Sequence, residues 1–372
     1  MRIAVFYNLP FSGAKRTVAE HVKGLKEFGH IVDVYTLDQE KDIFSPGNHA
    51  DNEYTYIYHQ RKVNLPFLRK ITEDLSDFYL LKKLHKRIAC DIDNAKYDIV
   101  LVHTDKLTQA PFILKYLKTK NVYFCLEPLK IAYEYGLRFS DSSPLPNKLY
   151  ELWNRGMRKA IDRENAQAAN HTFAISYFGR ELMIQAFDLY PKISYLGVDI
   201  KKFKKIKRKK KNQILFVGQK IEMNGYEIAQ EAVSLIPKSK RPELKILSIS
   251  KNKKDRLSDE EIVGLYNESL VTLTLSNFDT FGLVALESLS CEVPVIAFNV
   301  AGYRETMLQG ETGYLVDFNA KEIADKFISL HDNPNLVKKM GRFGRKWVEN
   351  EWTWDKQIRI LEQHLRLIVD EK

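Results

Sequence analysis

The chain has 372 residues, with 58 lysines and arginines against 48 aspartates and glutamates and a formal net charge of +10. Nine of the basic residues fall within positions 201–211, so the rest of the chain carries only 10 − 9 = +1. A protein coated with positive charge for binding nucleic acid is therefore excluded, and the 44% hydrophobic content excludes wholesale disorder. At roughly 100–200 residues per domain, the length predicts two domains.

The three cysteines, Cys90, Cys125 and Cys291, do not form a CxxC pair. Their odd number and spacing argue against a disulfide framework or a structural zinc site and fit a reducing compartment. No apolar run reaches the ~18 residues of a membrane span, and the N-terminus has no small-residue cleavage site. We therefore expect a cytoplasmic protein.

The first half of the chain alternates between short apolar runs and amphipathic stretches. Residues 3–6 and 31–35 are expected to be strands, and apolar residues at helical spacing from Val18 to Phe28 predict a helix between them. This strand–helix–strand opening is typical of a parallel sheet with right-handed crossovers. Further strands are expected at 99–103, 122–125 and 172–175, with helices at 71–88 and 148–169.

The same alternation starts again after the basic run. Residues 214–218 predict a buried strand, and Ser258 begins a capping box that predicts the start of a helix. Further strands are expected at 244–249, 270–275 and 293–298, with helices at 225–236 and 282–289 and a terminal amphipathic helix within 352–368.

We therefore predict an α/β protein with two Rossmann-like parallel-sheet domains. The expected boundaries are 1–194 for the first domain, 195–212 for a basic linker, 213–350 for the second domain and 351–372 for a C-terminal helix.

The stretch 276–287 carries the most chemical information. A strand leads into a loop, and residues 281–283 begin a helix that contains Glu287. Gly282 permits a ligand to approach the backbone, and the free N–H groups at a helix start suit a phosphate. Glu287 offers two acceptor oxygens to a sugar diol, and Asp279 lies eight positions earlier. An ordinary strand–helix turn explains these few residues about equally well.

Other segments extend the pattern around Asp279 and Glu287. They are 291–297, 301–305, 310–316, the junction 195–203, Ser176 after its strand and Gly13 in the first strand–helix loop. Together these motifs resemble the retaining glycosyltransferases of family 4, or glycosyl transferases group 1, which have the two-domain GT-B fold. The resemblance is strong over 276–316 and weaker in the N-terminal half. It implies two sheets facing a cleft and a C-terminal helix that crosses back to the first domain.

The resemblance also implies a nucleotide-sugar donor, UDP- or GDP-linked, bound mainly by the C-terminal domain. Two catalytic roles carry over: Asp279 would contact the transferred sugar, and Glu287 would contact the ribose hydroxyls. The donor-binding residues would be the backbone N–H groups of Phe281, Gly282 and Leu283, together with Gly218, Gln219, Lys220 and Gly13.

A glycan, lipid-linked or other hydroxyl acceptor would bind the N-terminal domain, where Glu127 and Lys130 are the candidates. The resemblance implies transfer with retention of anomeric configuration and without a divalent metal or other cofactor. The only Asp-x-Asp segment, Asp91 to Asp93, fits a turn at a helix end better than a metal site.

Several positions depart from the family pattern. Gln219 and Asn224 are neutral where the family has Arg and Lys for the diphosphate, although Lys220 is one position away. Asp279 is one methylene shorter than the usual Glu, the segment 126–130 lacks the family's His, and a strand–helix unit is missing between 249 and 258.

Two hypotheses remain open: an active glycosyltransferase with a remodelled donor site, and a GT-B-fold binding or accessory subunit without transfer activity. Nucleic-acid binding has only the basic run in its favour, because no recognition motif accompanies it.

Membrane contact is a further prediction. Residues 61–70 mix four basic side chains with apolar ones and could lie on anionic headgroups, although a helix start packed on the sheet explains them equally well. The run 201–211 is open to three interpretations: a solvated linker, a contact with anionic lipid, or attraction of anionic donors.

Overall fold

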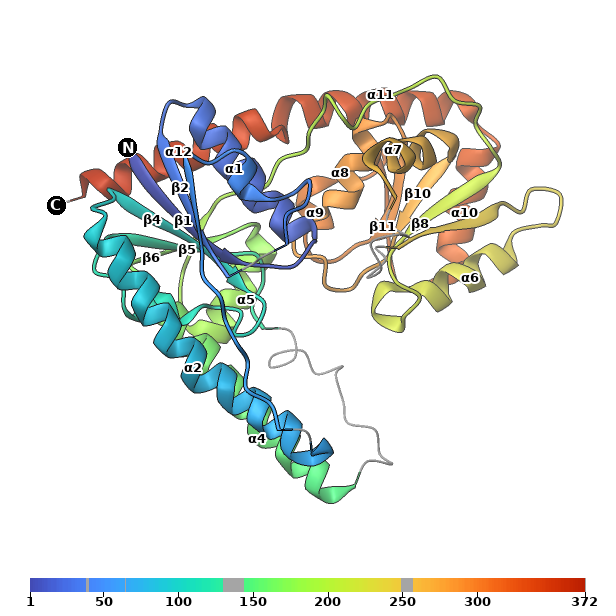
Figure 1. Ribbon diagram of the computed structural model, residues 1–372. Coiled ribbons are helices and arrows are strands. Elements are labelled where there is room, and N and C mark those ends of the chain that lie inside the picture. The colour runs from blue at the N-terminus through green and yellow to red at the C-terminus, as the bar shows by residue number, and fades with distance from the viewer. Residues whose placement is uncertain (38–39, 64, 130–143, 249–256, 372) are drawn as a thin grey trace. The chain divides into compact units, whose positions relative to one another are not determined.

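The computed structural model describes residues 1–37, 40–63, 65–129, 144–248 and 257–371 (Figure 1). The chain divides into two compact units. The first unit comprises Met1–Ile175, Gly179–Ser194 and Ile358–Lys372, and the second comprises Ser176–Phe178 and Tyr195–Gln357.

The first unit is built on a seven-stranded parallel sheet with the order β3-β2-β1-β4-β5-β6-β7. Its strands are β1 (Arg2–Asn8), β2 (Ile31–Thr36), β3 (Asn52–Thr55), β4 (Ile99–Asp105), β5 (Asn121–Cys125), β6 (His171–Ala174) and β7 (Lys192–Ile193). In the central register Val5 lies opposite Val34 on one side and Leu101 on the other. Every residue of β4 is buried, which explains why its first four residues, 99–102, are a continuous apolar run.

The helices of this unit are longer than the sequence pattern predicts. They are α1 (Gly13–Glu27), the 3-10 turns η1 (Pro46–Asn48) and η2 (Phe112–Lys115), α2 (Pro66–Asn94), α4 (Leu145–Gln167) and α5 (Tyr177–Phe187), of which the first two residues belong to the second unit. α2 begins before the predicted residue 71 because Pro66 suits the first turn of a helix, where no N–H partner is needed.

The second unit contains a five-stranded parallel sheet with the order β12-β11-β10-β8-β9. Its strands are β8 (Gln213–Val217), β9 (Glu243–Leu247), β10 (Val271–Thr274), β11 (Val295–Phe298) and β12 (Gly313–Val316). The helices are η3 (Glu222–Asn224), α6 (Tyr226–Leu235), α7 (Asp259–Glu268), α8 (Leu283–Ser290), α9 (Tyr303–Thr306), α10 (Ala320–His331) and α11 (Pro334–Glu351). The predicted capping box is confirmed, since the Ser258 hydroxyl accepts from the Glu261 N–H and the Glu261 carboxylate accepts from the Ser258 N–H.

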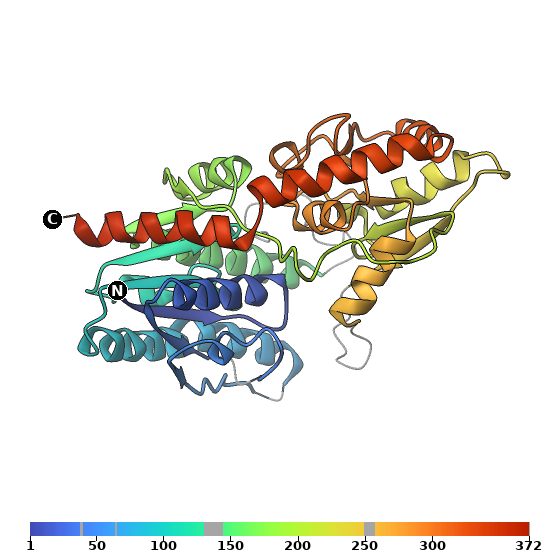
Figure 2. The same ribbon diagram turned by 90° about the horizontal axis from the view of Figure 1, so that it is seen from above.

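The last helix, α12 (Trp354–Asp370), returns to the first unit, as the sequence predicts (Figure 2). Its apolar stripe, which includes Ile358, Leu361 and Leu365, is buried. A Cβ atom placed on Gly24 of α1 would lie 2.7 Å from Ile358 Cγ1, so a glycine is needed where the two helices touch.

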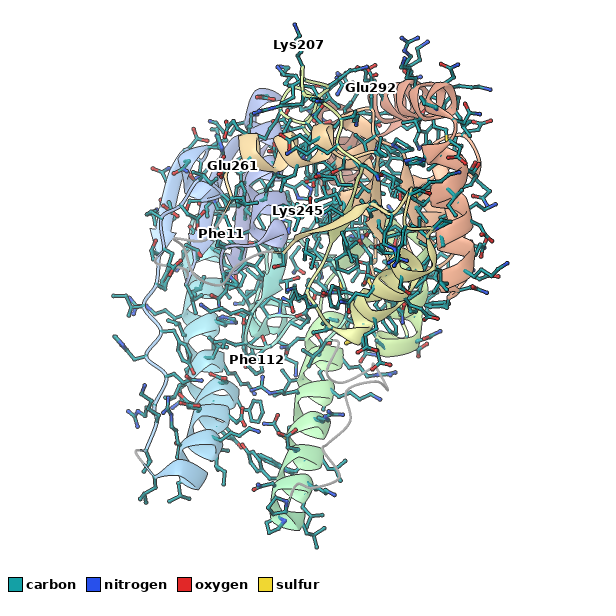
Figure 3. All side chains as sticks on the ribbon, turned by 90° about the vertical axis from the view of Figure 1, so that its right-hand side faces the viewer. Phe11, Phe112, Lys207, Lys245, Glu261 and Glu292 are labelled. Atoms are coloured by element: carbon teal, nitrogen blue, oxygen red, sulfur yellow. The ribbon has the colours of Figure 1, made fainter. Side chains whose placement is uncertain are left out.

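The basic run 201–211 is part of the second unit, whereas the sequence predicts a linker between domains at 195–212. Phe203 is buried against Tyr266, with ring centroids 6.2 Å apart, and this contact holds the segment on the unit. Three lysines of the run pair with acids of the same unit: Lys202 with Asp259, Lys205 with Glu292 and Lys211 with Glu268, each at 2.5 Å. Others, such as Lys207, point outward (Figure 3). Part of the excess charge is therefore neutralised locally.

Candidate functional site

In the second unit, the strand order reverses between β8 and β10, because the chain continues from β8 to β9 on one side and then to β10 on the other. Ligands of open α/β sheets bind outside the carboxyl ends of the strands at such a reversal. The loop 218–225 follows β8, and the loop 275–282 follows β10. The two loops touch, since the Asn277 N–H donates to the Met223 carbonyl at 3.3 Å. Most of the predicted donor residues lie on these two loops.

The Asp279 side chain stabilises the loop that precedes α8. Its Oδ1 accepts hydrogen bonds from the N–H groups of Phe281 at 3.1 Å and Gly282 at 2.7 Å. This corrects the expectation that both N–H groups are free for a diphosphate: the short Asp side chain reaches the donors two and three residues ahead, as in an Asx turn. Leu283, the third predicted donor, is half-buried at the first position of α8.

Tyr303 holds the other side of the Asp279 carboxylate. Its hydroxyl lies 2.7 Å from Thr274 Oγ1 and donates to Asp279 Oδ2 at 3.2 Å. Burial and the neighbouring Asp279 charge raise the pKa of the Tyr303 hydroxyl, so it stays protonated and able to donate. The sequence analysis matched the segment 301–305 to the family but did not assign Tyr303 a role.

Glu287 lies in the middle of α8 and is half-buried. Its Oε2 accepts a hydrogen bond from the hydroxyl of Tyr266 at 3.1 Å. Tyr266 is fully buried on α7, so it fixes the orientation of a carboxylate that is otherwise reachable from solvent. Because Tyr266 reads as one more core residue of an amphipathic helix, no signal in the sequence marks it.

Uncharged residues make the side-chain contacts within the loop after β8. Gly218 has a φ of +157°, and a Cβ there would lie 3.3 Å from Asn224 Cβ. The Asn224 side-chain amide donates to the main-chain carbonyl of Gln219 at 3.4 Å, so Asn224 bonds the backbone of the loop. Lys220 is exposed, with its ammonium 6.0 Å from the centroid of the Tyr226 ring. Lys220 is thus the basic side chain that this loop presents.

Two further residues that matched the family pattern have structural partners within the second unit. The Ser176 hydroxyl donates to the Thr280 carbonyl at 2.5 Å. The Glu305 carboxylate accepts from the N–H groups of Tyr177 at 2.9 Å and Phe178 at 3.2 Å. These bonds tie the segment 176–178 to the loop that carries Asp279 and to α9.

The first unit has a corresponding reversal between β1 and β4, and a buried polar cluster that the sequence analysis missed lies there. Asn8 ends β1 and donates to Asp105 Oδ2 at 2.9 Å, while His85 Nε2 lies 3.5 Å from the same oxygen. Burial raises the pKa of Asp105 to about 6. A polar residue at the end of an apolar strand was the available signal for both Asn8 and Asp105.

The remaining predicted residues lie apart from these clusters in the sequence and are less constrained. Gly13 is exposed at the start of α1, with no atom within 4 Å of a Cβ placed there. Glu127 follows β5 and is half-buried, and its carbonyl accepts from the Gln109 side chain at 2.8 Å. Lys130 lies outside the described residues.

The Asp-x-Asp segment lies in the last turn of α2, as predicted. Asp91 accepts from the Tyr56 hydroxyl at 2.8 Å, and Asp93 accepts from the Thr119 N–H at 2.9 Å. Among the residues that the structure describes, no three His, Cys, Asp or Glu side chains are grouped so that they could hold a metal ion.

Comparison with known proteins identifies the segment that contains both motif acids. Residues 252–347 match the model of the family described as Glycosyl transferases group 1. This segment, about a quarter of the chain, is similar to the glycosyl transferases group 1 family. The capsular polysaccharide biosynthesis glycosyltransferase CapM of Staphylococcus aureus is 37% identical over 92 residues, which are 24% of each chain. An uncharacterized 41.2 kDa protein in the cps region of Klebsiella pneumoniae is 25% identical over 86% of this chain and 89% of its own.

The architecture is also similar to that of solved structures. The structure of Anabaena HepE in complex with UDP and glucose matches with a TM-score of 0.69 at 15% identity, over 98% of this chain and 99% of that one. The expected GT-B fold, with two parallel-sheet α/β domains, is thereby confirmed. The chain spans from 24% to 57% of the length of CapM and the D-inositol 3-phosphate glycosyltransferases that it also matches.

Proposed function

We propose that the protein is a glycosyltransferase that moves a sugar from a nucleotide-sugar donor, UDP- or GDP-linked, to a hydroxyl of a glycan or lipid-linked acceptor. The observation that carries the proposal is that the two motif acids of the group 1 segment follow β10, where the strand order reverses: Asp279 lies in the loop after β10, and Glu287 lies in the next helix, α8. The neighbour in complex with UDP and glucose supports the donor class. Retention of configuration and independence of a metal are part of the proposal, by resemblance to family 4.

Glu287 and the start of α8 are placed to bind the donor. The Glu287 carboxylate, oriented by the Tyr266 hydroxyl, is the kind of group that accepts hydrogen bonds from the two hydroxyls of a ribose. The helix end at Leu283 presents its positive dipole end to the loops after β8 and β10, which favours a diphosphate. Exposed Lys220 would add positive charge from the loop after β8.

Transfer requires stabilisation of two charges. The sugar passes through an oxocarbenium-like state while negative charge builds on the leaving diphosphate, and fixed donors lower that barrier most. Asp279 contributes by holding the loop: three hydrogen bonds, from Phe281, Gly282 and Tyr303, occupy its carboxylate. A carboxylate has about four acceptor positions, so one position remains for a sugar hydroxyl.

The alternative function is that of a GT-B-fold binding or accessory subunit without transfer activity. The residue types at positions 219 and 224 favour it, because neutral Gln219 and Asn224 stand where the family has Arg and Lys for the diphosphate. Both functions predict a folded donor-binding unit, and only turnover separates them.

Donor hydrolysis tests the proposal. The protein is incubated with a panel of UDP-, GDP- and other nucleotide sugars, and released nucleotide is measured. We expect hydrolysis of one donor, lost in Glu287→Gln and retained in Glu231→Gln, which changes an exposed helical glutamate of the same unit. Binding of a nucleotide sugar without hydrolysis or transfer would favour the accessory subunit, and no binding to any member of the panel would refute the proposal.

We also propose that the protein works in the cytoplasm on the surface of an anionic membrane. Its reduced cysteines fit that compartment, since Cys90, Cys125 and Cys291 are all free. A peripheral position would give the enzyme access to lipid-linked acceptors. Within the described ranges, every helix is too short or too polar to span a bilayer.

A further inference from the structure

Two helices of the first unit extend beyond its sheet as an arm (Figures 1 and 3). We define the helical arm as residues 65–80 of α2, including its N-cap, and 145–158 of α4. Both helices begin at the far end of the arm, and both join the sheet at their C-terminal halves.

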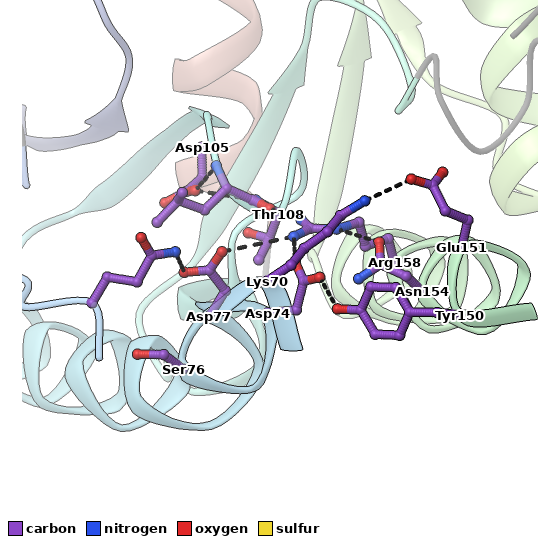
Figure 4. Close-up of polar contacts among 12 residues, drawn as sticks. Lys70, Asp74, Ser76, Asp77, Asp105, Thr108, Tyr150, Glu151, Asn154 and Arg158 are labelled. Atoms are coloured by element: carbon purple, nitrogen blue, oxygen red, sulfur yellow. Dashed lines mark hydrogen bonds and ion pairs between the residues drawn. The ribbon is translucent and has the colours of Figure 1, made fainter. Parts of the chain in front are cut away.

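The inner faces of the two helices are joined by charged and polar groups (Figure 4). The Arg158 guanidinium donates to Asp74 at 2.5 Å, and the Tyr150 hydroxyl donates to the same carboxylate. Nearer the tip, Lys70 pairs with Glu151 at 2.6 Å. The charges between the helices therefore stabilise the arm itself and hold α2 and α4 in a fixed relation.

The outer faces of the arm are apolar and exposed, which reverses the usual amphipathic pattern of a surface helix. Eight large hydrophobic side chains are between 38% and 68% exposed: Leu65, Leu68, Leu75 and Tyr79 on the α2 side, and Leu145, Leu149, Leu152 and Trp153 on α4. The steps of three, four and seven residues place each set along one stripe. At roughly 100° per residue, these stripes lie opposite Asp77 on α2 and Asn154 on α4, so their leucines face away from the contact between the helices. Trp153 lies at the edge of its stripe, and its ring packs against that of Phe78 on α2, with centroids 6.3 Å apart.

Basic residues border the apolar surface. The segment 61–70 carries four basic residues and no acid. Arg69 and Lys70 pair with Glu73 and Glu151, whereas Arg61 and Lys62 are exposed beside the start of α2. Two exposed lysines, Lys82 and Lys83, follow Tyr79 along the same side of α2 at steps of three and four residues. Leucines flanked by lysines and arginines, with a Trp and a Tyr among them, match the boundary between headgroups and acyl chains.

We propose that the helical arm is a peripheral membrane anchor that lies in the headgroup region of an anionic lipid bilayer. Its leucines reach the acyl boundary, and its basic residues pair with anionic headgroups. An anionic bilayer fits better than an apolar protein partner, because exposed basic residues, Arg61, Lys62, Lys82 and Lys83, border the exposed leucines. The inference names the surface through which the proposed enzyme would reach lipid-linked acceptors, and it does not require sugar transfer to be correct.

Vesicle cosedimentation tests the anchor. The full-length protein is mixed with phosphatidylcholine vesicles, with or without phosphatidylglycerol, at low salt and at about 0.5 M salt. We expect binding to the anionic vesicles that weakens at high salt. Leu68→Glu combined with Leu149→Glu should lower the partition coefficient at least about tenfold. Lys82→Gln and Lys83→Gln should each lower it about fivefold.

Leu367→Glu is the matched control, because this leucine is 59% exposed on α12 of the same unit, away from the arm in sequence. It should bind vesicles like the wild type. No binding to anionic vesicles at low salt, wild-type binding by the Leu68→Glu/Leu149→Glu variant, or an equal loss in Leu367→Glu would each overturn the proposal. A dimer in solution that the double variant abolishes would also overturn it, by showing that a second copy covers the arm.

The test separates the anchor from the proposed enzymatic function. Donor hydrolysis without vesicles should be unchanged in Leu68→Glu/Leu149→Glu. Conversely, Glu287→Gln should lose hydrolysis and still bind vesicles. Failure of the anchor and failure of the sugar transfer would therefore be seen in different measurements.

Discussion

Replacing Gly302 by alanine would disturb the loop that carries Asp279 through a single methyl group. The backbone of Gly302 has φ −66° and ψ −17°, a helical conformation that alanine adopts without strain. A Cβ there would lie 2.5 Å from Phe281 Cα and 2.6 Å from its C and N atoms. The effect of Gly302→Ala would thus come from contact alone.

The magnitude follows from how far the loop must move. An ordinary contact begins at 3.4 Å, so the backbone of Phe281 must retreat by 3.4 − 2.5 = 0.9 Å. Phe281 is 2% exposed and bonded to Asp279, so the retreat costs about 1–3 kcal/mol, as other overpacked sites do. At about 2–4 °C for each kcal/mol, the thermal midpoint of the second unit should fall by about 2–12 °C.

Two measurements check this prediction. Tryptophan fluorescence follows unfolding near the loop, because the Trp352 ring lies 5.6 Å from that of Phe281. Calorimetric titration measures the affinity for UDP and GDP, and a turnover assay measures the rate with the donor. Both depend on the position of the loop, and a shift of about 1 Å can lower the rate up to about 100-fold.

The control is Gly264→Ala in α7, where the atom nearest to the new Cβ would be 4.0 Å away. It should stabilise the unit by about 0.5–1 kcal/mol. Wild-type stability and donor affinity in Gly302→Ala would refute the reasoning.

Three further predictions follow from buried or helical positions. Tyr266→Phe removes the hydroxyl that orients Glu287 and should weaken donor binding about tenfold in a calorimetric titration, with the fold unchanged. Burial raises the pKa of Asp162 from 3.8 to about 7, so the folded state binds this proton more tightly than the unfolded state does. The stabilisation from this proton is complete below about pH 4 and is lost as the pH rises through about 7. In urea unfolding, the free energy of unfolding of the wild type should therefore fall relative to that of Asp162→Asn by up to about 1.4 kcal/mol per pH unit. Gly156→Ala in α4 meets no atom within 4 Å and should stabilise the first unit by about 1 kcal/mol, seen as a higher urea midpoint.

Local sequence was sufficient to locate most strands and the motif acids. Strands β1, β4, β8 and β10 overlap the predicted apolar runs, because a parallel strand covered on both faces is mostly apolar. The capping box at Ser258 depends on residues three positions apart, so it too was readable. Helix boundaries were less accurate: α2 begins at Pro66, inside a segment whose basic and apolar residues suit a membrane surface as well as a helix start.

The chemistry around the motif acids was decided by the tertiary structure. Tyr266 bonds Glu287 from 21 residues away, and Tyr303 bonds Asp279 from 24 residues away. Asn8 and Asp105 meet across 97 residues, only because β1 and β4 are neighbours in the sheet. The arm likewise depends on Arg158 reaching Asp74 over 84 residues. A sequence states which residue types are available, but hydrogen-bond partners and exposed faces depend on which strands and helices come to lie together.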